Sequence, residues 1–414
     1  MAESFLLAWR ALVRGHVLTA LLALTALAHL FLPALVRSDG TAAGAREVFL
    51  RAVPGGVYMV LCVALLACAC GLVARARESH RLALAAVRPV SAGALLFGPF
   101  LALVAVAAVV LAFNAGLTCA RGGWTDCRHV YAPVLEPPET VAKQMLQDIL
   151  ADTNTPREIR TAPRHRLLSI LTGREIDRYE NIPPTCTASW PFPDEAAASE
   201  GATARIRFST QFNMRSELSG VVTLGPWSAV VSNNTQSVLE IPLVRPPDQG
   251  AGWDTKLSFH NTGKTTVMLR PRRDVEVLTP ADSFVMNTLR ATCEMLCVVA
   301  FLCAFGLFLS ASLSRPVAIF TALVMLVVVE MAPAVVAQYP DTLDLPMSDR
   351  MGLWLSHAVA FATSALAEPQ PISDLATGTC VEWSTLARTA FVNAVVAPLV
   401  LLSLAAYIVR RRAS

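Results

Sequence analysis

"AGALLFGPFLALVAVAAVVLAFNA", residues 92–115, contains no charged residue and is long enough to cross a membrane as a helix. A helix needs about 20 predominantly apolar residues to span the hydrocarbon core of a bilayer. The chain of 414 residues is 54% hydrophobic and only 16% charged, which excludes an ordinary soluble protein. We therefore predict a polytopic α-helical membrane protein with six transmembrane helices. The other apolar runs lie at about 16–36, 55–73, 284–312, 316–338 and 386–409.

The distribution of arginine sets the orientation of these helices. Basic residues precede the first run, separate the second from the third and the fourth from the fifth, and follow the sixth. With six crossings, all of these clusters fall on one side, which the positive-inside rule assigns to the cytoplasm. A shorter apolar stretch at 351–367 is interpreted as interfacial or re-entrant, because a seventh crossing would place the last arginines outside. The arginines are Arg10, Arg14, Arg75, Arg77, Arg81, Arg88, Arg315 and Arg410–Arg412.

The N-terminal stretch "ESFLLAWRALVRG" at 3–15 combines Trp9 with basic residues, as helices on a membrane surface do. We predict a retained interfacial helix, so that both termini are cytoplasmic. A cleaved signal peptide is the alternative. It is disfavoured because "HLFLPALVRS" at 29–38 lacks a small-residue cleavage site.

Residues 117–283 form the only long polar region and are expected outside the cytoplasm. "PPETVAKQMLQDILAD" at 137–152 predicts a helix, and "ENIPPTCTASWPFPDE" at 180–195 reads as proline-rich turns. From about 203 the apolar period approaches two, which predicts an antiparallel β-sandwich. The predicted strands lie at 204–212, 218–225, 227–232, 237–244, 254–261 and 264–271.

The expected organisation is therefore three regions. Residues 1–116 form an N-terminal membrane region and 117–283 an inserted α+β, mainly β-sandwich-like, extracytoplasmic domain. Residues 284–414 form a C-terminal membrane region with an external re-entrant or interfacial segment at about 345–370.

Cysteine chemistry is limited. Cys119 and Cys127 are predicted outside the cytoplasm, where an oxidising compartment permits a disulfide, and we predict that they pair. Cys293 and Cys297 have helical spacing, but no histidine or carboxylate set completes a metal site with them. We expect no metal and no cofactor.

Enzymatic motifs are missing from the sequence. "NTGKTT" at 261–266 resembles part of a phosphate-binding loop, but Ser258 stands where that loop requires glycine. The sequence contains no G-x-S-x-G, no H-E-x-x-H and no paired C-x-x-C. We predict a protein that is not an enzyme, has no catalytic residues of its own and binds no nucleic acid.

Two acidic residues fall inside predicted spans, where a charge is costly. Glu294 follows Arg290 by four residues, so the two could pair on one helical face, and Glu330 precedes Pro333. Two roles stay open for both acids, namely helix packing or lining a substrate pathway.

The stretch "ARARESHRLALAAVRPVS" at 74–91 joins the second and third apolar runs and forms a short amphipathic helix in our interpretation. Its simplest role is a basic anchor that enforces topology. It also resembles the cytoplasmic loop of ABC-2 type transporter permeases, in which a charged cluster and a small helix precede Pro-Val-Ser or Pro-Val-Thr. The matching residues are Arg77 and Glu78, then Leu82 and Leu84, then Pro89, Val90 and Ser91.

In that family, the loop is the coupling helix that docks on a separate ATPase subunit. The resemblance implies a coupling helix at about 75–88 and either a homodimer or a dimer with a paralogous permease. It also implies export, which is the commonest direction of transport in that family. Two features depart from the family: Ser79 and His80 replace a common Gly-Thr pair, and Ala92 replaces a basic residue. The large domain at 117–283 also exceeds the usual loop. The residues expected to couple to the ATPase are Arg77, Glu78, His80, Arg81, Leu82, Leu84, Arg88 and Pro89.

The resulting prediction is a permease subunit in a bacterial inner membrane, contacting lipid, with an extracytoplasmic domain that binds an exported molecule or an envelope partner. The alternative is a non-transporting receptor or scaffold, in which that domain binds a ligand and the helices act as its anchor.

Overall fold

A computed structural model of the chain divides into two compact units. The membrane unit comprises residues 1–125, 283–336 and 354–414, and the sheet unit comprises 126–282 with 337–353. The residues that the structure describes are 2–35, 42–78, 92–121, 126–152, 164–198, 201–207, 209–210, 218–225, 227–233, 238–243, 255–338, 347, 351–352, 354 and 370–413.

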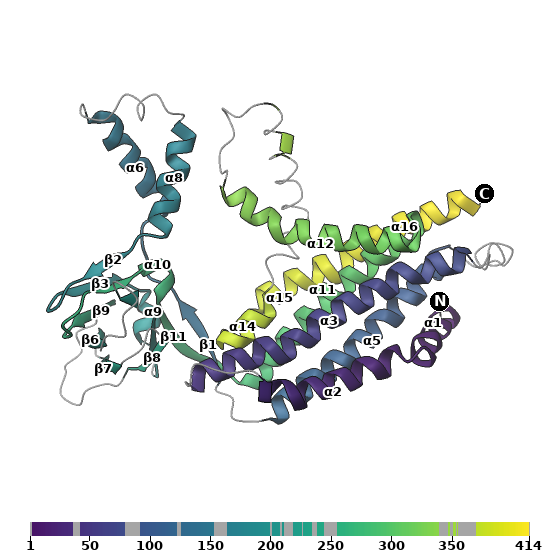
Figure 1. The fold of residues 1–414 in the computed structure, drawn as a ribbon, viewed down its shortest axis with the longest axis horizontal. Coiled ribbons are helices and arrows are strands. Elements are labelled where there is room, and N and C mark those ends of the chain that lie inside the picture. Colours follow the sequence, from purple (N-terminus) through teal and green to yellow (C-terminus); the bar gives the residue numbers. More distant parts are fainter. Residues whose placement is uncertain are drawn as a thin grey trace. The chain divides into compact units, whose positions relative to one another are not determined.

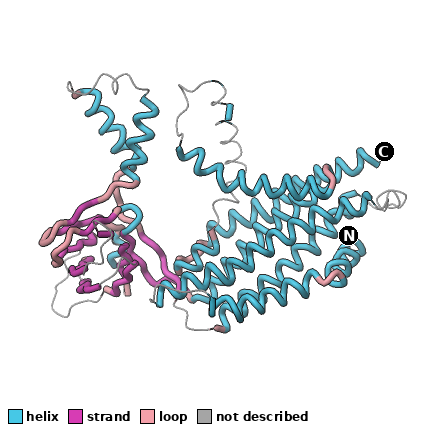
Figure 2. Tube along the Cα trace, viewed as in Figure 1, coloured by secondary structure: helices cyan, strands magenta, loops and turns pink. Residues whose placement is uncertain are grey.

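The membrane unit is built from helices, most of them long and apolar (Figures 1 and 2). They are α1 (Ala2–Arg14), α2 (Val17–Leu35), α3 (Ala42–Glu78), α5 (Ala92–Ala120), α11 (Phe284–Ser312), α12 (Arg315–Gln338), α14 (Pro371–Thr377), α15 (Trp383–Thr389), the π-helix η2 (Ala390–Val396) and α16 (Ala397–Ala413). Within the described part of the chain, 5 helices are long and apolar enough to cross a membrane. The chain is thus a helical membrane protein with a separate sheet-rich domain. These helices span Val17–Leu35, Gly44–Val73, Leu95–Ala120, Phe284–Ser312 and Trp383–Arg411.

The predicted span at 316–338 forms α12, whose described apolar part, Arg315–Val328, is shorter than the other spans. The second predicted run, 55–73, belongs to a longer helix, because α3 begins at Ala42 and includes Pro54. Hydropathy missed its first turns because Arg46, Glu47 and Arg51 lie there.

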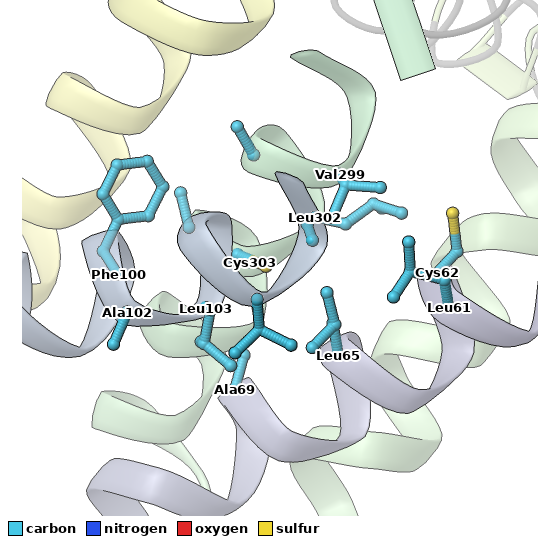
Figure 3. Close-up of a cluster of buried hydrophobic side chains, with 14 of the residues drawn as sticks. Leu61, Cys62, Leu65, Ala69, Phe100, Ala102, Leu103, Val299, Leu302 and Cys303 are labelled. Atoms are coloured by element: carbon cyan, nitrogen blue, oxygen red, sulfur yellow. The ribbon is translucent and has the colours of Figure 1, made fainter. Parts of the chain in front are cut away.

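Helices α3, α5 and α11 form the centre of the membrane unit (Figure 3). Lipid is as apolar as a leucine side chain, so such helices associate by close packing rather than by the hydrophobic effect. Gly306 of α11 is an example, because a Cβ at this position would lie 2.7 Å from Cβ of Ala69 on α3. The side chains of Figure 3 come from α3 (Leu61, Cys62, Leu65, Ala69), α5 (Phe100, Ala102, Leu103) and α11 (Val299, Leu302, Cys303).

The N-terminal segment forms the predicted helix, α1, which packs along α5. Ala8 and Leu12 are buried, whereas Leu7 is 68% exposed. The two helices meet at Gly98, where a Cβ would lie 2.5 Å from Cβ of Ser4. The start of α5 therefore accepts α1 only because position 98 has no side chain.

The sheet unit contains three antiparallel sheets with the strand orders β1-β11-β4-β8, β2-β10-β5 and β3-β9-β6-β7. Side chains from all three sheets share one hydrophobic core, among them Ile206, Phe259 and Leu269, so the arrangement is sandwich-like. The strands are β1 (Cys127–Tyr131), β2 (Glu180–Ile182), β3 (Thr187–Pro191), β4 (Thr203–Arg207), β5 (Ser209–Thr210), β6 (Leu218–Leu224), β7 (Trp227–Asn233), β8 (Val238–Pro242), β9 (Lys256–Asn261), β10 (Val267–Leu269) and β11 (Val275–Asp282).

All six predicted strand regions are confirmed, but the interpretation of 180–195 as turns is wrong. This segment contains β2, β3 and the start of the short helix α9 (Asp194–Ala198). Its prolines do not interrupt a ladder, because Pro183 and Pro184 lie between strands and Pro191 ends an edge strand.

A helical hairpin completes the sheet unit. The predicted helix at 137–152 is confirmed as α6 (Pro138–Ala151), and it pairs with α8 (Arg164–Ile176), which the sequence did not predict. Ala142, Leu146 and Leu171 form the small apolar contact between the two helices.

Candidate functional site

The predicted coupling segment lies largely outside the described residues. Arg77 and Glu78 belong to the last turn of α3, and α5 resumes at Ala92. The remaining predicted coupling residues lie outside the described part of the chain, namely His80, Arg81, Leu82, Leu84, Arg88 and Pro89.

The helix ends that flank this segment are described, and the end of α3 lies close to the basic start of another helix. A Cβ on Gly71, two turns before α3 ends, would lie 3.3 Å from Nε of Arg315. The end of α3 is therefore adjacent to the start of α12. In the second turn of α5, Gly98 touches Ser4 and Phe5 of α1, and Arg10 and Arg14 lie further along that helix.

The strongest candidate site is a buried polar face on α11. Asn287, Arg290 and Glu294 follow one another at spacings of three and four residues, which places them on one side of a helix. Their exposed fractions are only 1%, 4% and 1%. Polar residues inside a membrane bundle are costly unless they are paired, so this face marks either a structural clamp or a binding site.

Asn287 clamps the irregular segment between α14 and α15. Its Nδ2 donates to the carbonyl of Thr379 at 2.8 Å, and its Oδ1 accepts from the N–H of Val381 at 2.8 Å. Non-helical backbone in a membrane protein is tolerated only where other groups satisfy it. Asn287 thus supplies the hydrogen bonds that the segment cannot make internally.

Arg290 holds the same segment. Its Nη1 donates to the carbonyl of Val381 at 2.9 Å and contacts Sγ of Cys380 at 3.1 Å, while Cζ lies 5.0 Å from the ring centroid of Trp383. The sequence suggested that Arg290 pairs with Glu294. These contacts instead direct the guanidinium towards the segment after α14.

Glu294 lies one turn deeper along α11. Its Oε1 accepts a hydrogen bond from Oγ1 of Thr389 at 3.5 Å. The second oxygen, Oε2, is buried and has no hydrogen-bond partner among the residues that the structure describes. Glu330, the other acid predicted to lie in a span, belongs to α12, and its side chain lies outside the described residues.

The helix that faces Glu294 is irregular at the same level. Between α15 and α16, residues Ala390–Val396 form a π-helix, and the N–H of Ala397 bonds the carbonyl of Val392, five residues back. Asn393 within it is only 1% exposed. Such π-helical turns are rare and are often found at functional sites.

Asp374 on α14 is the neighbouring acid outside the spans. Thr379 Oγ1 donates to its Oδ1 at 3.2 Å, and the Thr379 N–H bonds its backbone carbonyl at 2.8 Å. Burial raises the pKa of Asp374 above its ordinary value, and the hydrogen bond from Thr379 opposes this rise.

The predicted disulfide between Cys119 and Cys127 stays a prediction, because the two residues belong to different units of the structure. Cys119 belongs to the last turn of α5, where it packs against a buried apolar cluster and bonds the Thr288 side chain. Cys127 opens β1, where it is buried and pairs in register with Asp282.

A second charged cluster lies on the β1-β11-β4-β8 sheet. Arg205 bridges Glu240 at 2.9 Å and Glu276 at 3.4 Å, and Arg128 reaches Glu240 at 3.0 Å. Arg205 of β4 thus pairs with both neighbouring strands, and Arg128 of the edge strand β1 reaches Glu240 of the opposite edge strand β8. This network stabilises the strand order and is not itself a candidate site.

Within the described residues, no group of three or more His, Cys, Asp or Glu residues could hold a metal ion. No protein-family model, curated protein or solved structure that was compared with the chain matches it. The sequence singled out Glu294 by its intramembrane charge but missed Asn287, Thr389 and Asn393. Uncharged polar residues within apolar runs give no signal of this kind.

Proposed function

We propose that the chain is the membrane-spanning permease subunit of an ABC-2 type transporter, powered by a separate ATPase subunit. It acts as an exporter in a bacterial inner membrane, with both termini in the cytoplasm and α12 as the fifth of six spans. The observation that carries this proposal is the approach of Arg315, at the start of α12, to the last turns of α3, which lead into the link with α5. The contact of Gly71 with Arg315 supports one basic side for these two helix ends.

A push on that link would reach the interior of the bundle through close packing. Helix α3 continues from Glu78 to its contact with α11, where Ala69 meets Gly306 without an intervening side chain. Helix α11 in turn holds residues 379–381 through Asn287 and Arg290. A displacement of α3 would thus be transmitted to the segment that precedes the last span. Two permease chains, identical or paralogous, would form the pathway between them.

Co-purification from the native membrane in mild detergent tests this proposal. The informative variant is Glu78→Lys with Arg81→Glu, and we expect it to recover at least about tenfold less ATPase subunit than the wild type, a loss of about 1.4 kcal/mol or more. The matched control is Glu47→Lys with Arg51→Glu. This exposed ion pair of 2.9 Å lies at the other end of α3, so the control exchanges the same charges on the same helix.

Equal recovery from all three proteins would refute coupling through 74–91. Failure to recover any ATPase subunit in several detergents would refute the transporter assignment. The alternative, a receptor or scaffold, is favoured by the sheet unit, which has its own hydrophobic core and is larger than an exporter needs. The receptor or scaffold alternative predicts that a ligand or an envelope protein co-purifies with the chain and that no ATPase subunit does.

A further inference from the structure

The surroundings of Glu294 are rich in oxygen and poor in positive charge. Glu294 itself is 1% exposed, and among the described residues its carboxylate accepts one hydrogen bond, the long one from Thr389. A carboxylate buried in a low-dielectric interior is very unfavourable unless a cation neutralises it. One hydroxyl donor at 3.5 Å is too weak to do so.

Among the described residues, the titratable groups around Glu294 do not provide that cation. Asp374 of α14 is another acid, Tyr58 faces it from α3, and Cys297 lies on its own helix. The π-helix has no ionisable residue, since its sequence is AFVNAVV. Arg290, one turn earlier, donates to the carbonyl of Val381.

The facing helix carries two buried neutral oxygen groups, namely Thr389, which bonds Glu294, and Asn393, four residues further on. Thr389 is 3% exposed and Asn393 is 1% exposed, and both lie on the stretch where α15 becomes the π-helix. A π-helical turn shifts the backbone hydrogen bonds by one residue and so exposes carbonyl groups. Interrupted helices of membrane proteins bind Na⁺ or protons through such groups.

From these observations we infer that Glu294, together with Thr389 and Asn393, forms a binding site for a monovalent cation. A single carboxylate and hard neutral oxygens suit one positive charge, carried by Na⁺ or by a proton. The cation would compensate the buried charge and tie α11 to the last span. The site is independent of the proposed permease function, because it requires neither an ATPase nor a substrate.

Thermal unfolding of the purified full-length protein in phospholipid nanodiscs tests this inference. The melting temperature is measured in NaCl and in choline chloride of equal ionic strength, and in choline chloride between about pH 5 and about pH 8. Saturating Na⁺ is expected to raise the melting temperature of the wild type by roughly 5–10 °C. If the cation is a proton, the melting temperature falls as the pH rises and Na⁺ has no effect.

The variant Glu294→Gln is expected to lose whichever response the wild type shows. For the pH series both proteins carry Asp374→Asn, because the buried Asp374 also makes stability depend on pH. Glu382→Gln is the matched control, because Glu382 is exposed and bonds only Ser384 in the contacts of its carboxylate that the structure gives. It should respond like the wild type. A wild type indifferent to both Na⁺ and pH would overturn the inference, as would a Glu294→Gln variant that responds normally.

A second variant covers the case in which Glu294→Gln does not fold. Thr389→Val keeps the carboxylate but removes the hydroxyl that bonds it. For a Na⁺ site, we expect a several-fold higher Na⁺ concentration at half of the maximal shift. For a proton site, the pH at half of the shift should move. An unchanged midpoint in Thr389→Val would contradict the assigned ligands.

Discussion

The clamp that Asn287 places on residues 379–381 can be tested by its removal. In Asn287→Ala, the two 2.8 Å hydrogen bonds are lost, and both backbone partners stay behind. The N–H of Val381 is buried, because the side chain of Val381 is only 3% exposed, so leaving it unsatisfied costs about 1–3 kcal/mol. The carbonyl of Thr379 is partly accessible and loses only the net value of a hydrogen bond, about 0.5–1.5 kcal/mol.

Together these losses destabilise the clamped conformation of residues 379–381 by roughly 2–4 kcal/mol relative to its locally open state. At about 1.4 kcal/mol per tenfold, local opening of residues 378–382 becomes at least about tenfold more frequent. Cys380 lies between the two anchored residues and reports this opening through its reactivity. Its rate of alkylation by a maleimide, followed by peptide mass spectrometry, should rise by the same factor.

The matched control removes another buried asparagine from the same unit. Asn114 on α5 bonds Nε2 of His29 at 2.9 Å and makes no contact with the segment in the bonds that the structure gives. Asn114→Ala should lower the melting temperature slightly and leave the alkylation of Cys380 unchanged. If Asn287→Ala and Asn114→Ala leave Cys380 equally reactive, the assignment of Asn287 as the anchor is refuted.

Two further outcomes concern the periphery of the bundle. Gly98→Leu should detach α1 from α5 and so increase cleavage by trypsin after Arg10. Gly116→Ala lies on the same helix, but its Cβ would meet open space, so this control should leave cleavage unchanged. Equal cleavage of the two variants would contradict the contact between α1 and α5. Asp374→Asn should have the melting temperature of the wild type at low pH and a higher one near neutrality. The folded state raises the pKa of this carboxyl, so wild-type stability is fully present below the ordinary pKa of aspartate and declines as the pH rises through the folded value. If the difference in melting temperature between Asp374→Asn and the wild type did not vary with pH, the buried charge of Asp374 would not be the cause of that difference.

Strong periodicity made most of the fold predictable. The apolar runs became the long helices, and the six alternating runs became strands, because both patterns report burial directly. Proline misled the prediction at 180–195, since its effect depends on whether it lies within a ladder or at its edge. In β11, Pro280 pairs with Arg128 beside a bulge, a context that only the partner strand reveals.

The candidate site was less predictable, for a physical reason. The charge of Glu294 stands out in an apolar run, but its partners come from a helix about a hundred residues later in the chain. The pairing of Arg290 with Glu294 rested on local spacing alone. In the structure, Arg290 donates to the carbonyl of Val381, which lies between two helices and so lacks an intrahelical partner.

The division of the membrane unit in sequence has a consequence for its biosynthesis. Helix α11 contacts α3, α5 and α16, yet it follows the whole of residues 126–282 in the chain. At about 5–20 residues per second, translation of that segment takes roughly 10–30 s. During this interval α3 and α5 are already made, but the surface that will receive Gly306 is still uncovered. A chaperone or insertase that shields this surface would therefore act before α11 leaves the ribosome, and its absence would expose the nascent chain to misassembly.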